Sequence, residues 1–325
     1  MIDRTVHPAS GDNVEAVLRE ELARGDAMAE TVLPILRHLI AAEDSSVFSE
    51  EILARVRGML ADLAGGMLDA MANAAGPDEA FARDDGIAEQ LTRAFMDNPA
   101  LISHLHALAL EWQLTERMQA RLALDPVVSP MLQELISSPD EGTQGLAMTF
   151  LAAQARWCQT QRRMTLPFRD LPGDLLHGVL ASLRSLGEQR PDLAERTGRA
   201  ETAIREAYDE GASRLGLAWR LVMTLGDGNR SALSLTHGGV ALFLTALALG
   251  SGQARDVVVL STHEAQLARL ALALRTAGLE PSGIEEQFLA LHPDVTLPEG
   301  FDRLGTDSAA SILASGHQQA GHYGG

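Results

Sequence analysis

The segment between Glu141 and Asp170 carries the residues best suited to recognising a partner. It contains four arginines and no acidic residue between those two positions, in a chain whose formal net charge is −18. Guanidinium groups bind carboxylates and phosphates through paired hydrogen bonds, and arginine and aromatic residues are enriched at protein interfaces. The candidate interaction patch consists of Arg156, Trp157, Arg162, Arg163, Phe168 and Arg169. The alternative is that these arginines pair with the protein's own acidic residues or cover a solvated face.

The ten histidines show no metal-binding spacing. His104 and His106 are two residues apart on a predicted helix, so their side chains point about 200° apart and cannot hold one ion together. His263 and Glu264 begin like a zinc-protease motif, but Leu267 stands where the second histidine would be. We therefore expect no metal site.

Three other features match known chemistry only in part. His177 lies on a predicted helix, as a phosphotransfer histidine would, but no lysine accompanies it. The loop 226–231 has two glycines of a phosphate-binding turn, but it follows a predicted helix rather than a strand and lacks the third glycine. The lone Cys158 excludes an intrachain disulfide and a cysteine-rich zinc site, and is typical of a small buried side chain. We expect no catalytic residues and no cofactor.

The charge composition excludes several classes of protein. All 26 residues in the lysine and arginine total are arginine, so the chain lacks a lysine for a Walker-A loop, a protein kinase or a pyridoxal phosphate Schiff base. Acidic residues outnumber basic ones 44 to 26, which disfavours nucleic acid as a partner because phosphate backbones repel a negative surface. The arginine patch therefore points to a protein partner, and a homo-oligomer is left open.

The compartment is predicted from the N-terminus and from one apolar stretch. Residues 1–8 lack the apolar segment of a secretory signal, and a single cysteine agrees with a reducing compartment, so we expect a cytoplasmic protein. The run 239–249 is apolar apart from one threonine, but it is about half the length that a bilayer requires. We expect a buried core helix there, with a spanning or membrane-dipping helix as the alternative.

The elements that must position these residues are predicted to be helices almost throughout. Apolar residues recur at intervals of three and four, leucine and alanine dominate, and the one β-like run, 257–260, is too short to build a sheet. Capping residues, prolines and glycines set the ends of these helices. The predicted helices cover roughly residues 12–24, 27–42, 48–74, 100–122, 139–158, 171–189, 191–225, 237–249, 264–276 and 282–291.

The domain organisation follows from this pattern. We expect an N-terminal extension (1–11), an all-helical region (12–293) with a subdivision near 76–85 or 190, and a flexible C-terminal tail (294–325) with at most a short turn at 308–314. The fold class is all-α, with about a dozen antiparallel helices in a HEAT-like solenoid or a bundle. No repeat of fixed period is evident in the sequence.

Two regions show a resemblance to a known family. Residues 146–156 (LAMTFLAAQAR) and 171–177 (LPGDLLH), with the later stretch from 239–243 (GVALF) to 274–279 (LRTAGL), resemble an uncharacterised bacterial all-helical family, a domain of unknown function with HEAT-like helix pairs. These regions cover about half the chain. The resemblance implies the all-helical fold and brings no activity, cofactor or catalytic residue with it.

Two functions remain open from the sequence. The first is a non-enzymatic helical scaffold or regulatory protein that binds another protein, which is favoured because no combination of nucleophile, base and orienting acid is evident. The alternative is a small-ligand sensor or an enzyme with a pocket between helices.

Overall fold

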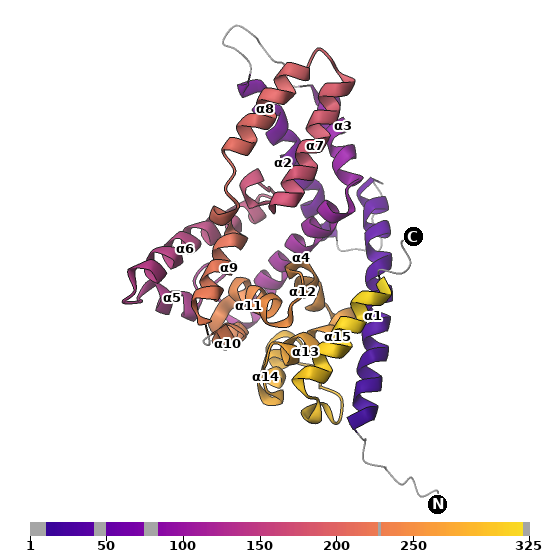
Figure 1. Cartoon of the computed structure of the whole chain (residues 1–325), viewed down its shortest axis with the longest axis vertical. Coiled ribbons are helices and arrows are strands. Elements are labelled where there is room, and N and C mark those ends of the chain that lie inside the picture. Colours follow the sequence, from indigo (N-terminus) through magenta and orange to yellow (C-terminus); the bar gives the residue numbers. More distant parts are fainter. Residues whose placement is uncertain (1–10, 42–49, 75–83, 227–228, 321–325) are drawn as a thin grey trace, which may run out of the picture. The chain divides into compact units, whose positions relative to one another are not determined.

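A computed structural model describes residues 11–41, 50–74, 84–226 and 229–320. Every regular element in these ranges is helical and none is a strand, which confirms the all-α fold class (Figure 1). These ranges contain fifteen α-helices, a few more than expected, because the helix expected over 191–225 is divided and because further helices lie where none was predicted: Asp85–Met96, Pro130–Ile136, Asn229–Ala232, Arg255–Ser261 and Thr306–Ala320. The N-terminal extension lies almost entirely outside the described residues.

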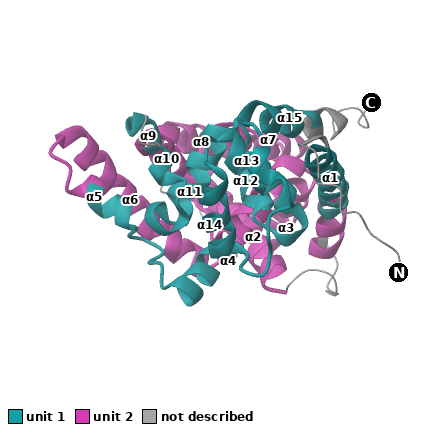
Figure 2. Cartoon of the chain, turned by 90° about the horizontal axis from the view of Figure 1, so that it is seen from below, with its two compact units in different colours: residues 1–32, 114–134, 222–325 teal, residues 33–113, 135–221 magenta. Residues whose placement is uncertain are grey.

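The chain forms two compact units, each built from separate stretches of sequence (Figure 2). Unit 1 comprises residues 1–32, 114–134 and 222–325, and unit 2 comprises residues 33–113 and 135–221. The chain passes between the units within four helices, α1 (Gly11–Ala41), α4 (Pro99–Leu122), α5 (Pro130–Ile136) and α9 (Arg214–Thr224). The expected subdivision near 190 is not a boundary between these units, and 76–85 lies mostly outside the described residues.

Unit 2 is organised around α2, whose regular apolar spacing buries one side of the helix along its whole length. α2 packs against α3 and α8, and α7 packs against α3 and α8, in the upper part of Figure 1. The other elements of this unit, α6 and the short helices η1 and η2, lie between α5 and α9 in the sequence. Its helices are α2 (Glu50–Asn73), α3 (Asp85–Met96), α6 (Glu141–Arg162), η1 (Phe168–Asp170), α7 (Gly173–Gln189), α8 (Ala194–Glu206) and η2 (Glu210–Ala212).

Unit 1 is organised around the apolar helix α11, which packs against α10, α12, α13 and α14. The positions from Val240 to Ala248 are all buried, so this run forms the interior of the unit. α11 bends at Gly239, where φ is 71° and where an added Cβ would lie 2.8 Å from Cβ of Ser129. The helices of this unit are α10 (Asn229–Ala232), α11 (Leu235–Ser251), α12 (Arg255–Ser261), η4 (Glu264–Gln266), α13 (Leu267–Thr276), α14 (Pro281–Leu291), η5 (Phe301–Arg303) and α15 (Thr306–Ala320).

No single described helix is long and apolar enough to cross a membrane. The consecutive helices α11 and α12 have a suitable combined length and composition, but they are bent by 111° relative to each other.

The region expected to be a flexible tail contains a packed helix within the described residues. Phe301 and Leu304 are buried, and α15 packs against α13. Within α15, Ile312 and Leu313 are 1% and 3% exposed. With Ala309 they follow the i, i+3, i+4 spacing of a helix that buries one face, a signal too short to stand out among the surrounding glycine, serine and aspartate.

Two predicted helix boundaries differ from the structure. The helices expected at 12–24 and 27–42 are one continuous helix, α1, and the Gly25 carbonyl at the expected break accepts a hydrogen bond from the Gln266 amide. The helix expected over 191–225 is divided at residues 207–213, where Asp209 caps η2 and the Tyr208 hydroxyl donates to the Leu171 carbonyl at 2.8 Å. That hydrogen bond ties this connection to the chain just before α7.

Candidate functional site

The four arginines of the patch are exposed on α6 and on the chain that follows it. Arg156 and Arg162 lie on α6, Arg163 caps its C-terminus, and Arg169 lies on η1. We call these four residues the α6–η1 surface. The side chains of Arg162 and Arg163 form no hydrogen bond or ion pair with any described residue, so they do not pair with the protein's own acids within the described chain.

The exposed face of α6 changes character along its length. Met148, which is 49% exposed, and Ala152 precede Arg156 at intervals of four residues, so the three side chains lie on one side of the helix. Glu141, in the first turn, is the one acidic residue of α6. The face therefore passes from an apolar to a cationic end without an intervening carboxylate.

The two aromatic residues of the sequence patch do not share this exposure. Trp157 is 1% exposed, and Phe168 is half-buried against α2, where an added Cβ at Gly66 would lie 3.1 Å from the Phe168 ring. Glycine at that position makes room for the ring. The structure thus gives the two aromatic residues a packing role, and only the four arginines of the patch are exposed.

Asp170 lies beside this surface and was not singled out in the sequence. Burial raises the pKa of its carboxyl group, while the charges of Arg214, Arg169 and Arg156 and a hydrogen bond from the backbone N–H of Arg214 act in the opposite direction. Arg156 and Arg169 are therefore close enough to act on the same carboxyl group. Arg162 and Arg163 are not among the charges that act on the Asp170 carboxyl group.

A buried ion pair lies on the inner side of α6. Arg214 donates from Nη1 and Nη2 to the two carboxylate oxygens of Glu111, at 2.8 and 3.0 Å. The two side chains are 2% and 1% exposed. Arg214 Nη1 is also 3.4 Å from Oε1 of Gln154, which belongs to α6. Paired hydrogen bonds of this geometry fix the orientation of a guanidinium group as well as its position.

Aromatic stacking continues inward from this ion pair. The Arg214 guanidinium lies 4.0 Å from the ring centroid of Trp157, and Trp157 meets Trp112 edge-on at 5.7 Å. On the far side, the Arg55 guanidinium lies 5.3 Å from the Trp112 ring and donates to the carbonyl of Gln161 at 2.6 Å. We call Arg214, Trp157, Trp112 and Arg55 the arginine–tryptophan ladder. It contacts α6 at Trp157 and Gln161, in the C-terminal half of the helix, and so holds the part of α6 that carries the arginines of the α6–η1 surface.

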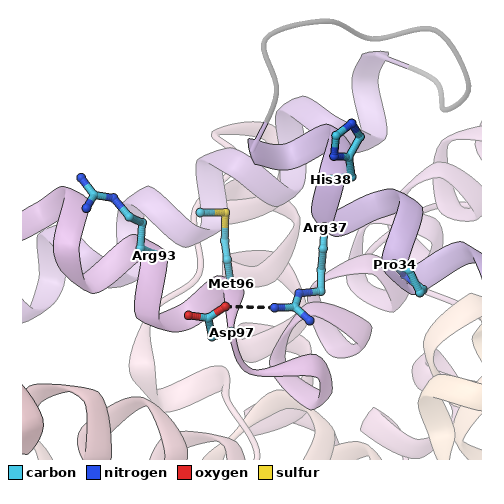
Figure 3. Close-up of a pocket in the computed structure, with 6 residues that line it drawn as sticks. All are labelled: Pro34, Arg37, His38, Arg93, Met96 and Asp97. Carbon is cyan, nitrogen blue, oxygen red and sulfur yellow. Dashed lines mark hydrogen bonds and ion pairs between the residues drawn. The ribbon is translucent and has the colours of Figure 1, made fainter.

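A cavity of about 450 Å³ lies in unit 2 between the second half of α1 and the end of α3 (Figure 3). Arg37 donates to Asp97 at 2.9 Å, as the dashed line shows, while Arg93 points away from that pair and bonds Glu89 at 3.1 Å. No sequence motif indicated this cavity. It is lined by Pro34, Arg37, His38, Arg93, Met96 and Asp97.

The remaining sequence candidates lie apart from these features. His104 and His106 are buried on α4, His177 is exposed on α7, and Cys158 is buried on α6. The Nδ1 atom of His263 accepts from the backbone N–H of Ala265 at 3.3 Å and caps η4. No group of three or more potential ligands suited to a metal ion lies within the described residues. Residues 227–228 of the glycine loop lie outside them.

A second charged cluster lies in unit 1 around His292. The ring Nε2 of His292 is 3.0 Å from the carbonyl oxygen of Thr262, and the residue is 5% exposed. Burial lowers the pKa of His292 most, Arg117 and Arg121 lower it further, and Glu264 and the Thr262 hydrogen bond act in the opposite direction. The folded protein therefore favours the neutral imidazole.

The depressed pKa of His292 predicts an acid-sensitive contribution to stability. The unfolded chain binds this proton below about pH 6.5, whereas the folded chain binds it only at lower pH. The stability from the neutral ring is therefore complete above that pH and is lost as the pH falls towards the folded pKa. Urea unfolding between pH 8 and 5 should show a shallower loss of stability in His292→Gln than in the wild type. Equal slopes in the two proteins would contradict this assignment, and His177→Gln, at an exposed site, is the control.

These observations define an all-α protein made of two helical units, one of which carries a cationic surface on α6 and η1. Comparison with family models, curated proteins and solved structures gives no match. The resemblance to the bacterial HEAT-like family gains no support from these comparisons, and the helical repeat stays a prediction.

Proposed function

We propose that the protein is a non-enzymatic scaffold or regulatory protein whose α6–η1 surface binds an acidic surface of a partner protein. One observation carries this proposal, namely four exposed guanidinium groups on a segment that is almost free of acidic residues, in a chain of net charge −18. Arg162 and Arg163 have no ion-pair partner among the described residues, so binding a carboxylate would not require an existing pair to break.

The apolar end of the α6 face supports a protein rather than a nucleic acid as the partner. Protein interfaces combine apolar contacts with charged groups at their edges, as Met148 and Ala152 beside Arg156 would provide. A nucleic acid would bring many phosphates towards a strongly acidic chain. The arginine–tryptophan ladder supports the proposal further, because a rigid surface loses less conformational entropy on binding.

We infer the cell compartment in which this function takes place from the sequence alone. The single cysteine agrees with a reducing compartment and favours the cytoplasm. The HEAT-like arrangement of helix pairs belongs to the same proposal, because stacked helices commonly present extended binding surfaces. The partner protein is unknown, and a second copy of this chain is left open as that partner.

Affinity capture from a cell lysate, followed by mass spectrometry, tests this proposal. We expect the wild type to retain a partner that the triple variant Arg156→Glu, Arg162→Glu, Arg163→Glu loses, because the reversed charges repel an acidic surface. A matched control reverses Arg184, Arg199 and Arg205, which are exposed on α7 and α8 and change the net charge equally. Circular dichroism confirms that each variant is folded.

Three outcomes would contradict the proposal. One is a partner that binds the wild type and the α6 variant equally, and another is the absence of any captured protein. Loss of the partner in both triple variants would also count against the proposal, since net charge rather than the α6–η1 surface would then control binding.

A second candidate function is the binding of a small molecule in the cavity of Figure 3. The volume of about 450 Å³ is in the range of small-ligand sites, and Met96 and Pro34 give it an apolar wall beside the Arg37 guanidinium. We propose that this cavity would take a ligand with a carboxylate and an apolar body. Such ligands should raise the melting temperature of the wild type but not that of Arg37→Met, and equal shifts in both would exclude the cavity.

A further inference from the structure

Arg117, on the part of α4 that belongs to unit 1, is an exception among the arginines of that unit. Its side chain is half-buried, its Nε is enclosed, and its guanidinium donates no hydrogen bond to any described residue. Other half-buried or buried arginines of unit 1 are bonded: Arg269 to Asp26, although its Nη1 lacks a partner, and Arg275 to the Leu304 and Leu279 carbonyls. The Nη1 and Nη2 atoms of Arg117 are not enclosed and donate to no described residue, so they can donate to a group from outside the chain.

The charges around Arg117 are mostly of the same sign. Arg121 follows one turn later on α4, and like charges at this spacing repel each other. Arg121 is already engaged, because its guanidinium reaches the carbonyls of residues 289–291 at the end of α14. Burial lowers the pKa of Arg117 most, followed by Arg121, while Glu264 acts in the opposite direction. The exposed carboxylate of Glu264 thus opposes the two guanidinium groups of Arg117 and Arg121.

We propose that Arg117, with Arg121 and His292 beside it, forms a binding site for the oxyanion group of a small ligand, with a phosphate monoester as the best match. A guanidinium group has several donors in a planar fork that fits tetrahedral and carboxylate oxyanions, and no described side chain occupies those of Arg117. This site lies in unit 1 and is independent of the α6–η1 surface, which lies in unit 2.

His292 makes the binding of such an anion depend on pH. Its imidazole faces Arg117 and Arg121 from α4, Glu264 from η4 and the carbonyl of Thr262 after α12. An anion between these groups would offset the two guanidinium charges that oppose protonation of the ring. By linkage, a bound dianion should favour protonated His292, and the dianion should in turn bind more tightly as the pH falls.

Sulfate is the first probe, because it remains a dianion throughout the useful pH range. Titration of sulfate into the full chain at constant ionic strength, with sodium chloride as the balancing salt, should give a saturable increase in melting temperature. We expect at least tenfold weaker binding in Arg117→Met, which keeps the length and apolar stem of the side chain. The matched control is Arg184→Met, which removes one exposed charge from unit 2.

NMR of His292 provides a readout that does not depend on the stability of a variant. Its ring signal is assigned by its loss in His292→Gln, and sulfate should raise the pKa of that ring in the wild type. Arg117→Lys, which keeps the charge, should retain part of this response if Arg117→Met does not fold.

Each result supports or overturns the site. Phenyl phosphate binding more tightly than benzoate would identify a phosphoryl ligand, and the reverse order would identify a carboxylate ligand at the same site. The proposal is overturned by non-saturable effects that chloride reproduces, by equal sulfate binding in the wild type and Arg117→Met, or by a His292 pKa that sulfate does not change.

Discussion

Replacing Arg214 with methionine is expected to lower the free energy of unfolding by about 3–5 kcal/mol. The substitution leaves the Glu111 carboxylate, which is 0% exposed, without the guanidinium that donates to both of its oxygens. It also removes the cation that stacks on Trp157. Chemical unfolding followed by circular dichroism would measure the change, and fluorescence of the two buried tryptophans would report the altered stacking.

An exposed pair that also has two hydrogen bonds provides the control. Arg190 bonds the two oxygens of the Asp192 carboxylate from Nε and Nη2, at 3.1 and 3.0 Å, and both side chains are exposed to solvent. Arg190→Met should therefore have a far smaller effect. Equal losses of unfolding free energy in the two variants would show that burial of the Arg214–Glu111 pair does not increase its contribution to stability. The double variant Arg214→Met, Glu111→Leu should recover part of the loss, because it leaves no buried charge behind.

Truncating Ile312 to alanine is expected to lower the free energy of unfolding by about 2–5 kcal/mol. Its side chain is 1% exposed on α15, in a region whose composition favours a flexible tail. Removing three carbon atoms from a closely packed position costs their transfer energy and leaves a cavity. The measurement is urea unfolding of the full chain.

Ser311→Ala is the matched control, because it changes the adjacent, exposed position on the same helix. We expect it to alter stability by no more than about 0.5 kcal/mol. If Ile312→Ala were equally neutral, α15 would not be part of the packed structure of unit 1.

The sequence was most informative where the signal is local. The spacing of Ile52, Val56 and Leu60 predicts α2 almost to its ends, since these side chains repeat on one face of a helix. The proline after Asn98 predicts the start of α4 in the same way. The cap of α6 is close to its predicted place, but the capping side chain is Asp140, which accepts from the backbone N–H of Thr143 at 2.7 Å, rather than Ser138.

The candidate site could be predicted only in part. The exposed arginines 156, 162, 163 and 169 follow from an acid-free run, whereas the burial of Trp157 depends on Trp112 and Arg214, which lie 45 and 57 residues away in the chain. A single sequence contains no signal for such a distant pairing. The one available hint was Glu111, a charged residue in an otherwise apolar stretch of a predicted helix. The site at Arg117 could not be predicted from the sequence either. Whether a donor lacks an acceptor depends on the side chains around it in the folded chain, which are distant in the sequence.

The central claim is that the α6–η1 surface meets an acidic surface of a partner protein, and a charge-swap experiment tests it most directly. The affinity of the captured partner is measured for the wild type, for Arg156→Glu, and for Arg156→Glu combined with reversal of single acidic residues on the partner. We expect Arg156→Glu to weaken binding at least tenfold and one reversal on the partner to restore it. Unchanged affinity of Arg156→Glu, or a loss that no reversal of an acidic residue restores, would contradict the claim.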